Sequence, residues 1–504
     1  MKVTGKKGAL INKDGNICRF PKFGYSYLND SSRLNKPLLK KNGKFVEISF
    51  SEAYEIIVDK IKSVNADENA FYAGARLSNE ELYLIQKMAR YAVGTNNVNS
   101  FLYLERGKGY FDSSRANVPF EQISGASKIY LFGSEINNDN AVVGFMVNNT
   151  RVTKNVPIEI VTTKSENSMT HKVDKVHNIK SYYHLVKAMN HFLLANGLEN
   201  AMFINDNCDD FDTYKKTLLT ENFDELFKKS GYSNIKEFEN FVKDYNNQMN
   251  GILIFSDKEI SGKTTQELFN LAMITGKLGK TSNGLISLKE KNNSQGIFDM
   301  GICSKMGVGG QIMNDNTYLE KLKIAWKTDS LPKLIKAGHI DMLDEGKIKN
   351  MFVFGEDPIG CAIDKKRISG WFSNAKFVVV QDYFMTETAQ KADLILPASL
   401  PLETDGSFTN TQRMIQEVYK QFTSKVDRLN YQQIHDLIEC FGDNEYETIN
   451  DVLLEAISLI PIKSENQKFT FNITEKDNSK RMFNFGCDSL VEKFEEEFKN
   501  KFEN

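Results

Sequence analysis

The stretch that decides the fold is "VVVQDYFMTETAQKADLILPASLPLETDGSFTNTQRMIQ", residues 378–416. Its first apolar run ends on Gln381 and Asp382, a polar turn follows, and a second apolar run closes on Pro397. Short continuous apolar runs between turn residues are typical of strands that are buried on both faces of a parallel sheet. Polar groups at the ends of such strands are where open α/β sheets bind ligands. The stretch therefore predicts an α/β fold with a ligand-binding edge.

Strands of the same kind recur along the chain and alternate with amphipathic helices. The apolar runs are 70–75, 128–133, 158–163, 251–257, 351–357 and 392–397, and helices are predicted from about 49, over 78–94, over 181–197 and over 264–276. Such alternation indicates parallel sheets covered by helices. We expect two parallel-sheet, Rossmann-like domains, one built from 95–297 and inserted in the other, which is built from 41–94 plus 298–413.

Size and composition limit the classes of protein to consider. A chain of 504 residues is too long for one compact core, and 41% hydrophobic with 26% charged residues is typical of a folded protein. The formal net charge of −2 gives no electrostatic case for nucleic acid or an anionic membrane. With neither a signal-like start nor an 18-residue apolar run, we expect a cytoplasmic protein that meets a membrane only through partners.

Six scattered cysteines argue against a disulfide framework. None of them forms a Cys-x-x-Cys pair; they are Cys18, Cys208, Cys303, Cys361, Cys440 and Cys487. We expect reduced thiols in a reducing compartment. The motifs of serine hydrolases, P-loop nucleotidases and His-Glu-x-x-His metalloproteases are also absent from the sequence.

The loops after three of the predicted strands carry the candidate chemistry. They are "LFGSEINNDN" with Gly133, "VFGEDPIG" with Gly355, and the "VVQDYFMTET" turn. Glycine lets a backbone approach a phosphate closely, although a turn between strand and helix needs glycine for its geometry alone. A fourth stretch, 275–301, is rich in glycine and amide side chains, and we expect a long loop with little regular structure, either functional or a plain surface connection.

Several segments of the chain resemble the molybdopterin oxidoreductase superfamily. The resemblance lies in "SNEELYLIQKMARYAVGTNNVN" (78–99), "LGKTSNGLISLKEKNNSQGIFDMG" (278–301), "GEDP" and 386–416, in the order of the family. It implies two α/β domains with a bis-pterin cofactor between them. Members resembling formate dehydrogenase also carry a C-terminal barrel, but only about 88 residues follow Gln416 here, so we expect no complete barrel. By residue match, the pterin–nucleotide cleft would be lined by Gly133, Ser134, Asn293, Gln295, Gly296, Gly355, Glu356, Pro358, Gln381, Asp382, Thr386, Glu387, Thr388, Asn410 and Gln412.

The sequence departs from the family where active members ligate metal. Members resembling formate dehydrogenase place a Cys or selenocysteine, followed by His, after the "GTNN" turn, whereas residues 99–114, "NSFLYLERGKGYFDSS", hold neither. An iron–sulfur cluster needs four thiolates, and Cys18 stands alone in a segment that resembles the end of the family's cluster domain. Phe20 matches the family's relay lysine. Cys18 could serve as a ligand only if a partner chain supplied the others.

These departures favour a degenerate member of the superfamily. Residues 23–30 and 292–302 resemble the large G subunit of NADH–quinone oxidoreductase, complex I, which keeps the fold without the active site. We therefore expect a structural subunit in a respiratory or iron–sulfur electron-transfer complex, with no bound cofactor and no complete iron–sulfur cluster. Residues 1–40 would be a remnant of the cluster domain. Residues 414–504 would form a tail or a partner-docking region. Two alternatives stay open: a molybdopterin-binding oxidoreductase resembling formate dehydrogenase, and a cofactor-free scaffold outside respiration.

Overall fold

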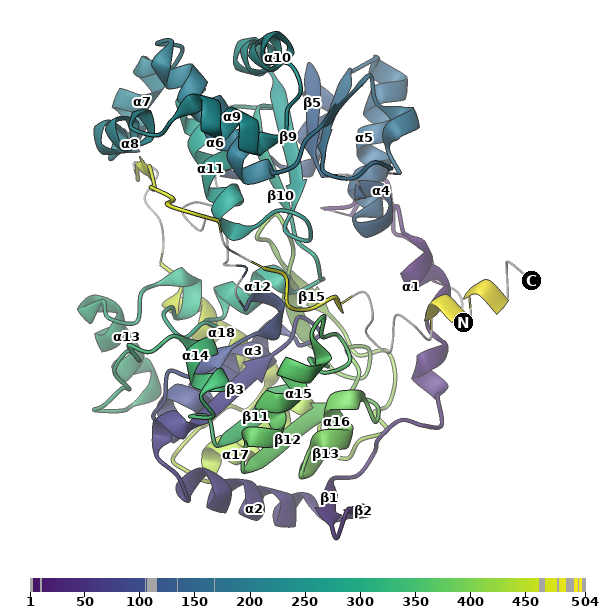
Figure 1. Cartoon of the computed structure of the whole chain (residues 1–504). Helices are drawn as coiled ribbons and strands as arrows, with labels where there is room; N and C mark the ends of the chain where they lie inside the picture. Colours follow the sequence, from purple (N-terminus) through teal and green to yellow (C-terminus); the bar gives the residue numbers. More distant parts are fainter. Residues whose placement is uncertain are drawn as a thin grey trace. The chain divides into compact units, whose positions relative to one another are not determined.

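The computed structural model describes residues 3–9, 11–104, 106, 116–133, 135–166, 168–461, 467–477, 480–485, 494–496 and 498–500. The chain forms two compact units. Figure 1 shows the chain with its helices and strands coloured along the sequence. Unit 1 comprises 1–22, 106–290 and 463–479, and unit 2 comprises 23–105, 291–462 and 480–504. The four-part domain division expected from the sequence stays a prediction.

Unit 1 is an α/β unit built on a five-stranded parallel sheet. Its strand order is β10-β9-β5-β6-β7. The elements are β5 (Lys128–Phe132), α4 (Ile136–Asp139), α5 (Ala141–Lys154), β6 (Ile158–Thr162), β7 (Lys175–Asn178), α6 (Tyr182–Ala195), α7 (Ala201–Asn207), β8 (Cys208–Asp209), α8 (Phe211–Leu219), α9 (Phe223–Ser230), α10 (Ile235–Asn247), β9 (Gly251–Ser256), α11 (Gly262–Ile274), β10 (Gly284–Leu288) and β16 (Phe469–Thr470).

Both faces of this sheet are buried, which explains why its strands are apolar throughout. Tyr130 and Phe132 of β5 join a core cluster with α6 and α11. Their neighbours Ile129 and Leu131 point to the opposite face and join a second cluster with α5. Because side chains alternate along a strand, burial on both faces requires an uninterrupted apolar run.

Unit 2 is an α/β unit built on a seven-stranded sheet in the order β2-β1-β13-β12-β11-β3-β4. Five strands are parallel, and the hairpin β1–β2 adds an antiparallel edge. The elements are α1 (Arg19–Phe23, at the boundary with unit 1), β1 (Leu38–Lys41), β2 (Lys44–Glu47), α2 (Phe50–Lys62), β3 (Asn69–Ala73), α3 (Asn79–Lys87), β4 (Val98–Asn99), α12 (Ser294–Asp299), α13 (Asn316–Trp326), α14 (His339–Asp344), β11 (Asn350–Phe354), α15 (Lys365–Asn374), β12 (Phe377–Asp382), α16 (Glu387–Lys391), β13 (Leu394–Pro397), β14 (Gly406–Thr409), β15 (Ile415–Val418), α17 (Asn430–Glu439) and α18 (Ile449–Leu459).

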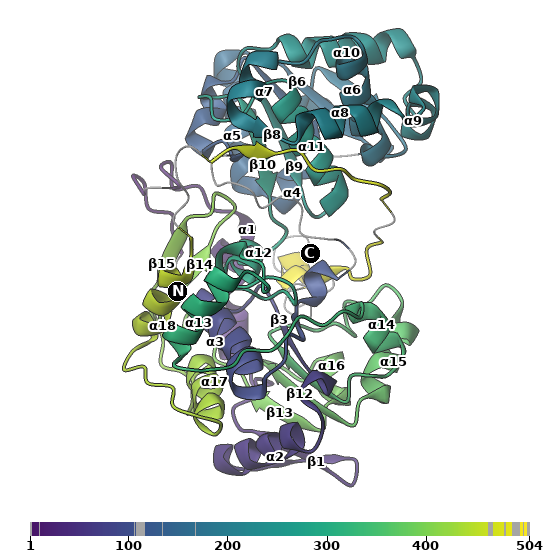
Figure 2. The ribbon, with the colours of Figure 1, turned by 90° about the vertical axis from the view of Figure 1, so that its left-hand side faces the viewer.

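Helices cover both faces of the unit 2 sheet. Figures 1 and 2 show α15 and α16 on one face and α3, α17 and α18 on the other. The predicted helix over 78–94 is confirmed: Ser78 caps α3, a π-helix (Met88–Val93) continues it, and Gly94 ends it in the left-handed conformation. Within the described residues the strands form open sheets and no closed barrel, as expected.

Two segments differ from what the sequence suggested: 38–47, where no strand was predicted, and 275–301, where a long irregular loop was expected. Residues 38–47 form a hairpin, whose turn residues Asn42 and Gly43 both have positive φ, the conformation that an Asn-Gly turn adopts. The glycine-rich stretch 275–301 holds a fully buried strand, β10, and the helix α12, because its apolar residues complete the sheet of unit 1 and pack in unit 2. No helix in the described parts of the chain is long and apolar enough to cross a membrane.

The C-terminal region contributes to both units. Strands β14 and β15 and helices α17 and α18 belong to unit 2, where α17 and α18 pack on α3. Residues 467–477 belong to unit 1: β16 pairs with β8, and Phe469 and Phe471 are buried in the core. Residues 480–485 return to unit 2.

A buried ion pair fixes the segment that precedes β1. The Arg33 guanidinium donates two hydrogen bonds to the Glu403 carboxylate, at 2.5 and 2.9 Å, and the two side chains are only 1% and 3% exposed. The backbone of Leu400 donates to the same carboxylate. Removing one partner of such a pair leaves a buried charge without compensation.

We predict that Glu403→Gln lowers the free energy of unfolding of unit 2 by about 3 kcal/mol, measured by urea denaturation. Asp427→Asn is the control, because the Lys36–Asp427 pair is exposed and should leave the midpoint unchanged. If the two substitutions lowered the free energy of unfolding equally, the buried pair would not stabilise unit 2 more than an exposed pair does.

Candidate functional site

The strand order of unit 1 creates a crevice between β5 and β9. From β5 the chain continues to β6 and β7 at one edge of the sheet, whereas from β9 it continues to β10 at the other. The loops that follow β5 and β9 therefore diverge, which is the topological switch point where open α/β sheets bind ligands. A pocket lies there, lined by Leu131, Phe132, Gly133, Glu135, Ile136, Asp139, Asn140, Ile254, Phe255, Ser256, Glu259 and Leu288.

The polar groups of this switch-point pocket are mainly hydrogen-bond acceptors. Glu135, Asp139 and Glu259 bring three carboxylates, and the buried Oδ1 atom of Asn140 has no hydrogen-bond partner. Lys164 approaches Glu259 at 3.2 Å and Glu135 at 3.9 Å, and Lys258 pairs with Asp139, so that each of the three carboxylates has an ammonium group beside it. A buried acceptor without a partner calls for a donor. The pocket therefore suits N–H and O–H groups, such as those of a nucleoside, better than phosphate oxygens.

Gly133, which the sequence predicted as a site residue at the end of a strand, lines this pocket. Its φ of +100° strains any other residue, and a Cβ atom would lie 3.2 Å from Oε2 of Glu259. Ser134, the next predicted site residue, lies outside the described residues.

Unit 2 has its own switch point, between β3 and β11, and there the two loops meet each other. A Cβ on Gly74, which follows β3, would lie 2.2 Å from the carbonyl oxygen of Gly355, which follows β11. The Arg76 side chain donates to that same carbonyl at 3.0 Å and forms an ion pair with Asp382 at the end of β12. These contacts join the two loops at the edge of the sheet, and Arg76, Ser78, Glu81 and Tyr383 line a small pocket beside them.

Glu356 is the central buried group of this edge. Its carboxyl accepts hydrogen bonds from Ser100 Oγ at 2.6 Å and from the backbone N–H groups of Phe101 at 3.1 Å and Leu102 at 3.4 Å. Burial raises its pKa to about 8, against the lowering effect of these donors and of Arg76. The carboxyl thus holds the Ser100–Leu102 turn onto the loop that follows β11.

The other predicted residues of the β11 and β12 loops are bonded within unit 2. Thr388 donates to Asp357 from its backbone N–H at 3.0 Å and from its hydroxyl at 2.6 Å, so the loop of Pro358 is tied to α16. The remaining residues have separate partners: Thr386 caps α16, Glu387 pairs with Lys365, Asp382 pairs with Arg76, and Gln381 Nε2 donates to Gln433. The Oε1 atom of Gln381 is buried without a hydrogen-bond partner.

The predicted amide residues form a second group around α12 and β14. Asn293 donates to the Leu77 carbonyl at 2.8 Å and accepts from the Thr409 N–H at 2.8 Å. Gln295 donates to Asp299, and a Cβ on Gly296 would lie 2.2 Å from Asn293 Oδ1. Asn410 binds Gln416 and accepts from the backbone of Gln412. These amides fasten α12, α3 and β14 to one another.

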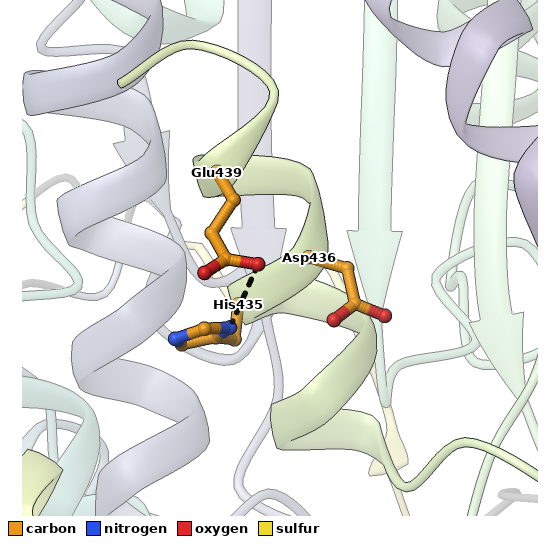
Figure 3. Close-up of side chains that lie close together, drawn as sticks. All are labelled: His435, Asp436 and Glu439. Atoms are coloured by element: carbon orange, nitrogen blue, oxygen red, sulfur yellow. Dashed lines mark ion pairs between the residues drawn. The ribbon is translucent and has the colours of Figure 1, made fainter. Parts of the chain in front are cut away.

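Groups of potential metal ligands are scarce among the described residues. Residues 99–104 and 106 contain no Cys or His, and Cys18 belongs to no group of three ligand side chains. One such group occurs on α17: His435, Asp436 and Glu439. Their ligand atoms lie within 4.8 Å of one another (Figure 3), but the Asp436 carboxylate is bonded to Arg428 and Tyr54. With Asp436 engaged, this group offers two ligands, too few for a structural metal site.

Three functional groups of the site were missed in the sequence. Arg76, Asn140 and Glu259 stand beside strand ends, and only the strand order, which puts β5 next to β9 and β3 next to β11, shows that they line the edges. The polar residues that follow "LFG" and "LIFS" could have indicated the site, because the carboxyl ends of parallel strands meet at one edge of a sheet.

Because the pKa of Glu356 is raised, we predict that this group makes the stability of the folded chain depend on pH. Between its ordinary value of 4.5 and about 8, the folded chain holds a proton that the unfolded chain has lost, so the group's contribution to stability falls as pH rises. Glu356→Gln removes this titration. The free energy of unfolding of the variant minus that of the wild type should therefore increase by about 2 to 4 kcal/mol between about pH 5 and pH 8.

Urea denaturation over this pH range measures the effect, and Glu387→Gln, at an exposed carboxyl of the same unit, is the control. A flat difference between Glu356→Gln and wild type would contradict the assignment of a buried titrating carboxyl.

Comparison with known proteins identifies relatives of the chain. It is 28% identical to the "F420-dependent formate dehydrogenase 2 subunit alpha" of Methanococcus maripaludis, over 89% of this chain and 68% of that protein. It is 28% identical to the Bacillus subtilis protein named "Putative formate dehydrogenase YrhE", over 95% of this chain and 50% of that protein. The chain thus spans about two thirds of the first relative and half of the second.

The fold is also that of a solved structure, acetylene hydratase from Pelobacter acetylenicus, with a TM-score of 0.60 and 15% identity over 85% of this chain and 64% of that one. Neither named sequence relative is a complex I subunit, so they do not support the narrower resemblance to the G subunit. The family model "Molybdopterin oxidoreductase" matches residues 33–439. The chain belongs to the molybdopterin oxidoreductase family.

Proposed function

We propose that this chain is the molybdopterin-binding part of an oxidoreductase of the formate dehydrogenase type. The observation that carries the proposal is the match of the molybdopterin oxidoreductase family model to residues 33–439, together with a small pocket at the switch point of unit 1. The names of the relatives support formate as the substrate and further subunits as partners. A cytoplasmic location, with any membrane contact made by partners, belongs to the same proposal.

The residues of unit 1 fit the nucleoside part of such a cofactor. The carboxylates of Glu135 and Glu259 line the pocket and would accept its N–H and O–H groups, and Gly133 leaves space where a side chain would project. When bound, the cofactor would supply two-electron chemistry at its metal. The chain's own part is to bind and orient it.

A second candidate is a structural subunit of an electron-transfer complex, with no cofactor. It is favoured by the absence of Cys and His from residues 99–114 and by the internal bonding of the predicted site residues of unit 2. A complex I role would be one case of it, although the relatives named above favour formate dehydrogenase. In this candidate, iron–sulfur chains are the partners and Cys18 has no cluster.

The proposal predicts that filling the pocket of unit 1 releases the cofactor. Gly133→Val should reduce the pterin that co-purifies with the chain by about tenfold or more, because the new side chain meets Glu259 in the pocket. The assay is fluorescence of the oxidised pterin per mole of chain, isolated from the native organism with its partners.

Gly197→Val is the matched control. Gly197 is in the same unit and also has a positive φ, but a Cβ there meets no atom within 4 Å, so backbone strain is present without obstruction of the pocket. Equal pterin in both variants would refute binding at this pocket. Absence of pterin from the wild type would favour the second candidate.

A further inference from the structure

A short C-terminal segment, residues 480–485 ("KRMFNF"), docks on unit 2. Met482, Phe483 and Phe485 are 8%, 3% and 5% exposed and belong to the main core cluster of that unit. The same segment adds one antiparallel rung to the loop that follows β11, opposite Ala362. An exposed tail would not bury three large apolar side chains.

Backbone hydrogen bonds set the register of this docked segment. Ile363 N–H donates to the Met482 carbonyl at 2.9 Å, and Asn484 N–H donates to the Cys361 carbonyl at 2.7 Å. The Lys291 ammonium donates to the Phe485 carbonyl at 2.7 Å. Addition of an extended segment to an available edge is a common mode of peptide recognition, with side-chain pockets for alternate residues.

The aromatic side chains of the segment reach the turn that Glu356 holds. The ring of Phe483 meets the ring of Phe101 edge-on, with centroids 5.5 Å apart, and Phe485 packs on Phe483 at 5.7 Å. Phe101 in turn stacks on Tyr72 of β3 at 4.3 Å. Phe101 is therefore held from two sides: its backbone N–H by the Glu356 carboxyl, and its ring by Tyr72 and Phe483.

We propose that unit 2 has a groove for an aromatic-x-aromatic segment, formed by Cys361–Ile363 and Phe101, and that residues 481–485 fill it as a detachable latch over the Ser100–Leu102 turn. The latch has one rung on a loop and no pairing with a strand of the sheet. Its detachment therefore breaks few hydrogen bonds and exposes three apolar side chains, so that local opening requires more free energy than fraying of an exposed tail and less than global unfolding. This inference does not depend on cofactor binding.

Hydrogen exchange of the full chain, followed by mass spectrometry, tests the latch. Phe483→Ala should speed the exchange of amides in residues 99–104 on the order of a hundredfold, because the lost ring contact favours the open state. Amides of β11 should exchange at the wild-type rate. Ile473→Ala is the control, because Ile473 lies in the part of the tail that belongs to unit 1 and is 47% exposed.

A synthetic peptide of residues 480–485 provides the second arm. Added to the Phe483→Ala variant, it should restore slow exchange over 99–104, whereas a peptide with alanine in place of both phenylalanines should not. Unchanged exchange in the variant would overturn the proposal. Equal acceleration of the β11 amides would also overturn it, because the segment would then be an integral part of the core rather than a latch, and so would failure of the wild-type peptide to restore protection.

Discussion

The burial of one carboxyl group, that of Glu356, is the constraint on which the loop contacts at the sheet edge of unit 2 depend. A carboxyl away from water is costly unless donors surround it. Here Ser100, Phe101 and Leu102 provide those donors, so the turn after β4 must sit against the loop after β11. Gly74 has no side chain where Gly355 approaches, and the tail packs on the turn that results.

The two units use the same topological principle with opposite results. Each has parallel strands that diverge at a switch point, and in each a glycine of positive φ follows a central strand: Gly133 in unit 1 and Gly355 in unit 2. In unit 1 the crevice retains a pocket with an acceptor that has no partner, Asn140 Oδ1. In unit 2 the loops at the edge between β3 and β11 are joined by Glu356 and Arg76. Our proposal places nucleoside recognition in unit 1.

Much of the fold could be predicted from the sequence because its strands are buried on both faces and its helices carry side-chain caps at Ser49 and Ser78. The hairpin of β1 and β2 was missed because its strands are short, half exposed and rich in lysine, which hides the apolar alternation. In the site, strand-end glycines were recognisable. The partners of Asn293 and Glu356 were not, since they lie more than a hundred residues away in the sequence and are brought together only by folding.

The metal content of the chain isolated from its own organism, with its partners, tests the central claim most directly. Plasma mass spectrometry would measure molybdenum and tungsten per mole of chain. The account predicts about one atom of molybdenum or tungsten, held through the pterin in a chain that offers no Cys or His in residues 99–114. Absence of both metals, with iron confined to co-purifying chains, would contradict it and leave the molybdopterin fold as the framework of a structural subunit.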